Sequence, residues 1–392
     1  MNDNIKKLYL QSVLNDVITL VISGGVLQTF MLEYGMGERN VSLAVAVYQV
    51  SEAVSMLLFS GRLEREKRIL KAYVRLLLLL LPMIVCMLVV SLTGGKEPEK
   101  AFIAMLITGA ITYGGVGVTG ALAYKIPYLL IDMKEYGRVI GMQGTISGCT
   151  CMVLSLGMSF LLKKTSYRTA APFFPLAAIL ALTVLIFNMN SVKKVADPPV
   201  TESGKIDLFR YRPFVLTFFP NLARGIGGGI LGIMTTVGYH AGIIDSVSAT
   251  YMVFITYATS MLGCFIFSKV SRFGHDGAVI LFCGVFMCIL MPFMVAKNSL
   301  VLFLVIYGAC QLLRATIDIA APSALAKVID YRAVVQCSAW RLALYMLGAA
   351  VSSYAALPLM DRFGYTAVLS VCGLLHLIMG IGYFIVTERK EV

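Results

Sequence analysis

The chain is dominated by long apolar segments separated by short polar or charged clusters. Twelve segments can be delimited, and each is about as long as the roughly 20 residues that an α-helix needs to cross a bilayer. They lie at about residues 9–33, 41–60, 70–93, 101–124, 139–162, 168–190, 212–237, 247–268, 277–296, 299–326, 334–357 and 366–387. The pattern predicts an all-α membrane protein with twelve transmembrane helices.

One polar stretch is longer than the others and divides the segments into two sets of six. It runs from Ser191 to Arg212 and is rich in lysine, proline and glutamate, as solvated linkers are. Six plus six is the layout of two parallel repeats. We therefore expect an N-terminal six-helix bundle over residues 1–190, a cytoplasmic linker over 191–211 and a C-terminal six-helix bundle over 212–392.

The composition narrows the function class. Hydrophobic residues make up 58% of the chain and charged residues only 14%, with a mean hydropathy of +0.83. Soluble domains carry about 25% charged residues, so a disordered chain, a disulfide scaffold and a soluble enzyme are poor fits. No metal-spaced group of cysteines and histidines occurs, and no nucleophile lies beside a base in sequence. We expect no enzymatic activity, no metal and no cofactor.

The net charge of +12 would suggest a nucleic-acid partner, but the positions of the charges argue otherwise. Most basic residues lie between the predicted spans on the same side, as the positive-inside rule requires when both termini are cytoplasmic. The polar start, Met1–Tyr9, leads into a run too long for a signal peptide. We expect a multi-pass protein of the cytoplasmic membrane that contacts anionic lipids and binds no nucleic acid.

Short basic stretches follow the second and the eighth span. The first reads Gly61-Arg62-Leu63-Glu64-Arg65-Glu66-Lys67-Arg68, and the second ends in Arg272-Phe273-Gly274. Both resemble the loop motif Gly-x-Leu-x-Asp-Arg-x-Gly-Arg-Lys of the major facilitator superfamily of secondary transporters. The resemblance implies a monomer in which two bundles rock to give alternating access. Its gating residues would be Gly61, Glu64, Arg65, Arg68 and Arg272, with Arg341 in the eleventh span.

Four spans carry polar residues on one face at intervals of three or four residues. These stripes are Ser12, Asp16, Thr19 and Ser23; Thr108, Thr112, Gly115 and Thr119; Thr217, Asn221, Arg224 and Gly228; and Tyr307, Gln311, Arg314 and Asp318. Polar groups facing lipid are costly, so each stripe either lines a cavity or joins helices. Spans 1, 4, 7 and 10 line the central cavity of the resembled family. The candidate substrate-binding residues are Arg224, Asn221, Arg314, Gln311, Tyr307, Tyr113 and Thr112.

Ionisable residues at membrane depth are the strongest functional candidates, because each costs a few kcal/mol there. Glu52, Asp16 and Asp318 are candidates to bind a coupling ion, either a proton or Na+. Arg314 and Asp318 are spaced to form an ion pair within one helix. Arg224 has no acid on its own helix face, so it is the best candidate to hold a substrate anion.

Gly115, Gly117 and Gly120 match the spacing of a dinucleotide-binding fingerprint. That motif requires a strand before it, whereas this one lies inside an apolar span, so we expect close helix packing instead.

The sequence thus predicts a proton-coupled transporter of a small organic solute, anionic or zwitterionic. Two alternatives remain open: efflux of neutral or cationic amphiphiles, and a membrane protein that binds a ligand without transporting it.

Overall fold

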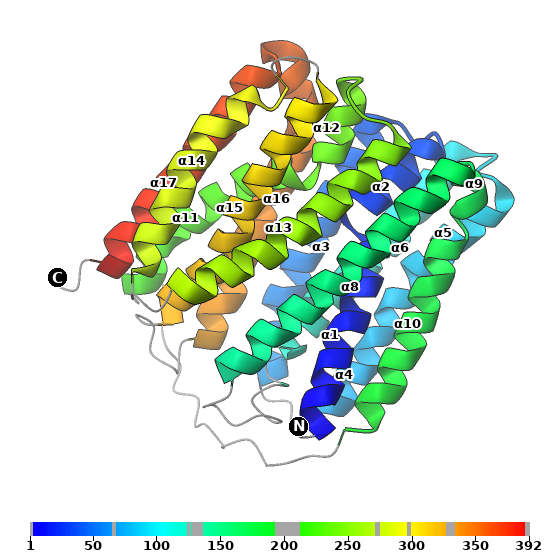
Figure 1. The fold of residues 1–392 in the computed structure, drawn as a ribbon. Helices are drawn as coiled ribbons and strands as arrows, with labels where there is room; N and C mark the ends of the chain where they lie inside the picture. Colours follow the sequence, from blue (N-terminus) through cyan, green and yellow to red (C-terminus); the bar gives the residue numbers. More distant parts are fainter. Residues whose placement is uncertain are drawn as a thin grey trace. The chain divides into compact units, whose positions relative to one another are not determined.

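The computed structural model describes residues 3–64, 68–123, 126, 136–192, 212–270, 275–295, 299–326 and 334–388 (Figure 1). Within these ranges every regular element is a helix. Eleven helical segments are long and apolar enough to cross a membrane. The seventh predicted span is helical as well, but Pro220, Asn221 and Arg224 make it less apolar. The all-α membrane fold predicted from the hydrophobic pattern is confirmed.

The described helices group into two compact units. Unit 1 comprises Met1–Val200 together with Asp245–Tyr257, and unit 2 comprises Thr201–Ile244 together with Ala258–Val392.

The described residues of unit 1 form six helical rods, three of which are interrupted, and the first half of a seventh helix. Its elements are α1 (Asp3–Ile22), α2 (Gly24–Glu33), α3 (Glu38–Glu64), α4 (Ile69–Leu77), η1 (Leu78–Leu80), α5 (Leu81–Thr93), α6 (Pro98–Ala123), α8 (Tyr136–Lys164), α9 (Tyr167–Ala170), α10 (Phe173–Asn190) and the start of α13 (Ser246–Val270). The first rod breaks where Gly24 adopts a φ of 57°, which favours glycine. The third breaks before Pro82, which lacks the N–H that a continuing helix needs.

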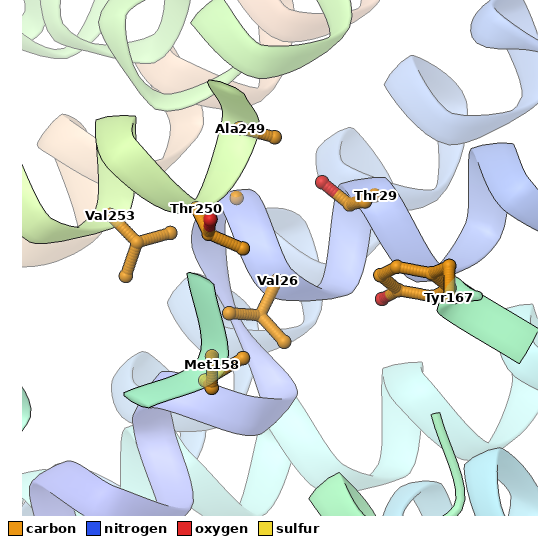
Figure 2. A pocket seen from close by; sticks show the side chains of 8 residues that line it. Val26, Thr29, Met158, Tyr167, Ala249, Thr250 and Val253 are labelled. Atoms are coloured by element: carbon orange, nitrogen blue, oxygen red, sulfur yellow. The ribbon is translucent and has the colours of Figure 1, made fainter. Parts of the chain in front are cut away.

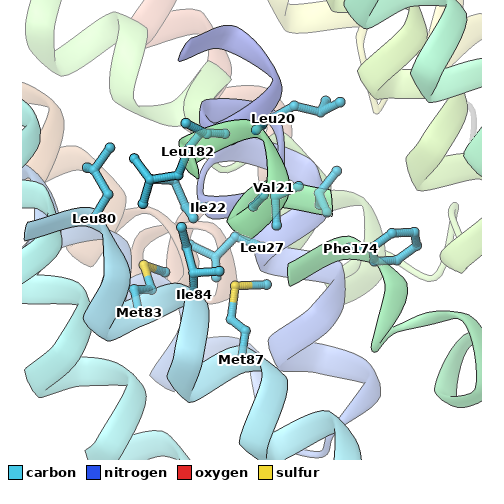
Figure 3. Close-up of a cluster of buried hydrophobic side chains, with 14 of the residues drawn as sticks. Leu20, Val21, Ile22, Leu27, Leu80, Met83, Ile84, Met87, Phe174 and Leu182 are labelled. Carbon is cyan, nitrogen blue, oxygen red and sulfur yellow. The ribbon is translucent and has the colours of Figure 1, made fainter. Parts of the chain in front are cut away.

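The apolar faces of these rods meet in one core. Figure 3 shows side chains from α1, α2, η1, α5 and α10 converging there, among them Leu20, Leu27, Met83, Ile84 and Leu182. All five are at most 4% exposed. This packing fixes the rotation of α1 and so the direction in which its polar stripe points.

Unit 2 contains the remaining rods. They are α11 (Arg212–Gly232), α12 (Met234–His240), the end of α13, α14 (Asp276–Leu290), η4 (Met291–Phe293), α15 (Leu300–Ala326), α16 (Val334–Phe363) and α17 (Tyr365–Glu388). The glycines of α11 let this helix touch its neighbours: a Cβ at Gly225 would lie 2.2 Å from the Tyr345 carbonyl oxygen of α16.

The glycines that match the dinucleotide fingerprint lie inside α6, as expected. A Cβ at Gly115 would lie 2.5 Å from the Leu79 side chain, and one at Gly117 would lie 2.6 Å from the Glu52 carbonyl oxygen. Both therefore permit close helix contacts.

Candidate functional site

Two helices of unit 2 bring three charged side chains together. Arg224 of α11 donates a hydrogen bond through Nη2 to Asp318 of α15, and Arg314 Nε lies 3.8 Å from the other carboxylate oxygen. The expected pair within α15 is thus present, but the closer partner of Asp318 is Arg224. Arg224 was expected to have no acid on its own helix face; its partner lies on another helix, 94 residues away.

Tyr345 of α16 holds both arginines in place. Its hydroxyl oxygen accepts a hydrogen bond of 3.0 Å from Arg314 Nη2. Its ring lies 4.8 Å from the guanidinium carbon of Arg224, within the range of a cation–π contact. One aromatic side chain therefore fixes the geometry of both cations.

These residues line a partly open hollow of about 190 Å³. Its walls come from α11, α15, α16 and α17 and consist of Arg224, Gly228, Arg314, Ile317, Asp318, Tyr345 and His376. Asp318 is 40% exposed, whereas Arg224 is 12% and Arg314 27% exposed. The carboxylate thus remains accessible while the cations are largely enclosed.

Sequence reasoning missed Tyr345 and His376. His376 of α17 is 2% exposed and its Nδ1 lies 2.9 Å from the Cys372 carbonyl oxygen. The available signal was an imidazole inside an apolar span, since ionisable groups at that depth are rare.

Arg341 lies in α16, near the same cluster. It is within electrostatic range of Asp318, but no ion pair joins the two residues. Its Nη1 is buried and has no hydrogen-bond partner among the described residues. Arg341 is therefore a third cation close to a single carboxylate.

The other candidates from spans 7 and 10 do not line the hollow. Asn221 is 1% exposed and bonds to two groups, donating to the Thr217 carbonyl oxygen at 2.7 Å and accepting from the Tyr383 hydroxyl at 2.7 Å. Gln311 is buried at 4% exposure. Tyr307 is 6% exposed, stacks on a neighbouring phenylalanine and lies within electrostatic range of Arg314.

In unit 1, Glu52 of α3 is a buried carboxylate, 9% exposed. No donor among the described residues forms a hydrogen bond with its carboxylate. Tyr113 of α6 lies within electrostatic range of it and stacks on Tyr48 with ring centroids 4.9 Å apart. The Tyr113 hydroxyl donates to the Ile22 carbonyl oxygen at 3.1 Å. The environment of Glu52 is thus aromatic and enclosed.

Thr112, also on α6, joins helices. Its hydroxyl donates to the Leu79 carbonyl oxygen at 3.1 Å and accepts from the Met83 backbone N–H at 3.3 Å. Both bonds lie beside the break in the third rod, where the helix leaves backbone groups unsatisfied. Of the two readings of the stripe in span 4, this geometry favours helix contact.

Asp16 lies between α1 and α8 and accepts a hydrogen bond from the Ser147 hydroxyl. Tyr73, Cys151 and Tyr257 lie within electrostatic range of it. Asp16 therefore differs from Glu52 in having a fixed donor and several polar neighbours.

The predicted gating residues are only partly described. Arg65 and Arg272 lie outside the described residues. Gly61 and Glu64 lie within the last four residues of α3, and Arg68 is exposed directly before α4.

Unit 1 also contains a hollow, of about 180 Å³, shown in Figure 2. It is lined mainly by Val26, Met158, Ala249 and Val253, with the Thr29 hydroxyl also facing it. None of its lining residues carries a full charge, so the charged hollow of unit 2 is the stronger candidate site.

The sequence profile of the Major Facilitator Superfamily matches residues 8–337, most of the chain. The chain belongs to this superfamily. Among curated proteins, none is significantly similar in sequence.

Two solved structures show that the fold is that of the superfamily. A crystal structure of a D-xylose-proton symporter aligns with a TM-score of 0.76 at 12% identity, covering 97% of this chain and 96% of that one. A crystal structure of a mutant of the nucleoside transporter NupG aligns with a TM-score of 0.68 at 13% identity, covering 98% of this chain and all of that one. This superfamily member is thus a multi-pass membrane protein with a transporter fold.

Proposed function

We propose that this superfamily member is a secondary active transporter of a small organic anion, which binds in the charged hollow of unit 2. The observation that carries the proposal is the charge imbalance of that hollow. Arg224 and Arg314 contribute two positive charges against the single negative charge of Asp318. Arg341, with a buried and unbonded Nη1, adds a third cation nearby.

An uncompensated positive charge in a membrane protein is costly, because the surrounding medium cannot solvate it as water does. A substrate carboxylate or phosphate supplies the missing negative charge, and guanidinium groups match such anions geometrically.

Glu52 is the proposed site of proton coupling. A buried carboxylate without a hydrogen-bond donor is not held in its ionised form, so it can gain and lose a proton during transport. Asp16 has a donor in Ser147, and Asp318 has two arginine partners. We therefore propose that Asp318 sets the net charge of the anion site. Asp16 remains the second candidate for binding the coupling ion, and Na+ remains the alternative to a proton.

The rest of the proposal follows the sequence pattern. Bundles over residues 1–190 and 212–392, joined by the linker 191–211, rock about the substrate in a monomer. The basic loops after spans 2 and 8 act as cytoplasmic latches, and both termini lie in the cytoplasm.

Two variants test the anion site: one removes a positive charge from the hollow and the other removes its negative charge. Arg224→Gln removes one of the two positive charges that line the hollow, and anion affinity should fall at least about tenfold. Asp318→Asn raises the excess charge and should tighten anion binding. Arg362→Gln, on the exposed end of α16, serves as the control. Binding is measured by thermal shift with organic anions, neutral sugars and cationic amphiphiles.

Stabilisation by cations or neutral solutes alone would refute the anion assignment.

The coupling proposal is tested separately in proteoliposomes with and without a pH gradient. Glu52→Gln should abolish stimulation by the gradient while substrate exchange continues. Wild-type flux that ignores the gradient would exclude proton coupling.

A further inference from the structure

His376 is a polar side chain that lines the charged hollow of unit 2 and to which the proposed function gives no task. It extends from α17 and is 2% exposed. One edge of its ring lies against α11, because a Cβ at Gly227 would be 2.4 Å from its Cε1 atom and 2.5 Å from Nδ1. A side chain at that position would displace the imidazole, so the glycine fixes where the ring sits.

The hydrogen bond of the ring determines which of its nitrogens can act as an acceptor. Nδ1 lies 2.9 Å from the Cys372 carbonyl oxygen, one helical turn earlier. A carbonyl oxygen can only accept, so Nδ1 carries a proton and donates it. In the neutral ring, Nε2 then has a lone pair and no proton. No group among the described residues forms a hydrogen bond with Nε2.

The remaining polar groups of the hollow have different tasks. The guanidinium groups of Arg224 and Arg314 only donate, and the Tyr345 hydroxyl already accepts from Arg314. Asp318 also accepts, but its negative charge repels an anion and is paired with both arginines. Among the described side chains that line this hollow, Nε2 of His376 is thus an uncharged acceptor without a hydrogen bond. It lies beside the cations that attract an anion.

We propose that His376 Nε2 accepts a hydrogen bond from a hydroxyl or amino group of the substrate, and that the substrate class is therefore small hydroxylated or aminated organic anions. This inference rests on the proposed function, because it assumes that Arg224 and Arg314 hold the anionic group. It adds a second point of recognition: the anionic end meets the arginines, and a nearby O–H or N–H meets the imidazole. A simple fatty acid has the anionic group for the arginines but no O–H or N–H group for the imidazole.

Matched anions that differ by one or more hydroxyl groups test the assignment. The probes are lactate against propionate, 3-hydroxybutyrate against butyrate, and gluconate against hexanoate, with affinities measured by thermal shift and competition. For at least one pair, the wild-type protein should bind the hydroxylated member roughly 10–100-fold more tightly, because the deoxy analogue leaves a buried acceptor unmet.

His376→Phe keeps the shape of the ring and removes the acceptor. It should reduce the preference within that pair to less than about threefold, mainly by weakening the hydroxylated member. His275→Phe, an exposed histidine of unit 2, is the matched control and should retain the preference. Melting temperatures of both variants show whether the fold is intact.

The outcomes separate the two proposals. Anions that bind without any preference for hydroxyl groups in the wild-type protein overturn the role of His376 and leave the anion site standing. An equal loss for both members of a pair in His376→Phe also overturns it, since a merely structural histidine would act in that way. Absence of binding by every anion overturns the proposed function and this inference together.

Discussion

Substitution of Gly117 tests the close contact between α3 and α6, on which the position of Glu52 depends. An alanine Cβ at this position would lie 2.6 Å from the Glu52 carbonyl oxygen and 2.8 Å from the Ser55 hydroxyl oxygen. Contacts of carbon normally begin near 3.5 Å, so α3 and α6 must separate by roughly 1 Å in Gly117→Ala. Such overpacking costs about 1–3 kcal/mol.

Gly120 provides the matched control, one turn further along α6. No described atom lies within 4 Å of the Cβ that Gly120→Ala would add. Both variants gain the same helix propensity, about 1 kcal/mol. That gain cancels in the comparison, and the difference between the two variants isolates the overpacking cost. At about 2–4 °C per kcal/mol, Gly117→Ala should melt roughly 2–12 °C below Gly120→Ala.

The assay is thermal unfolding in detergent, followed with a thiol-reactive fluorophore. The eight described cysteines are unpaired and at least half-buried, so unfolding exposes them to the reagent. Gly117→Ala should also lose stimulation of uptake by a pH gradient, because the displaced backbone carries Glu52. Equal melting temperatures for the two variants would refute the reasoning.

Three further predictions concern single hydrogen bonds. Tyr345→Phe removes the hydroxyl oxygen that accepts a hydrogen bond from Arg314 but keeps the ring. Anion affinity, measured by competition, should fall about tenfold, and unchanged affinity would contradict the positioning role of Tyr345. Tyr383→Phe removes the hydroxyl that donates to Asn221. It should lower the free energy of unfolding by about 0.5–1.5 kcal/mol in melting experiments without altering anion affinity. A selective loss of affinity would instead favour a contact between Asn221 and the substrate. Asp245→Ala removes the N-cap of α13 and should cost about 1 kcal/mol at neutral pH. Partial burial of this carboxyl opposes ionisation, but the hydrogen bonds that it accepts prevail and lower its pKa from 3.8. The cap therefore stabilises the protein above about pH 4 and is lost as pH falls through the lowered pKa, so variant and wild type should converge in acid.

The polar stripes illustrate how far sequence reasoning extends. A spacing of three or four residues correctly placed Arg314 and Asp318 on one face, because the pitch of a helix is a local property of its backbone. The same reasoning could not reveal the partner of Arg224, because nothing in its own helix indicates an acid 94 residues away. It also grouped Asn221 with Arg224, although packing against α17 turns Asn221 toward Tyr383.

The sequence by itself determined the membrane class, the positions of the spans and the short list of charges at depth, because bilayer thickness and desolvation act on each segment separately. Only the tertiary structure decided which charges meet. The shared carboxylate of Asp318, the bracing by Tyr345 and the unoccupied acceptor of His376 each depend on how helices rotate and approach one another. Glycines such as Gly225 and Gly227 set those approaches through contacts between helices, and such contacts leave no periodic pattern along the chain.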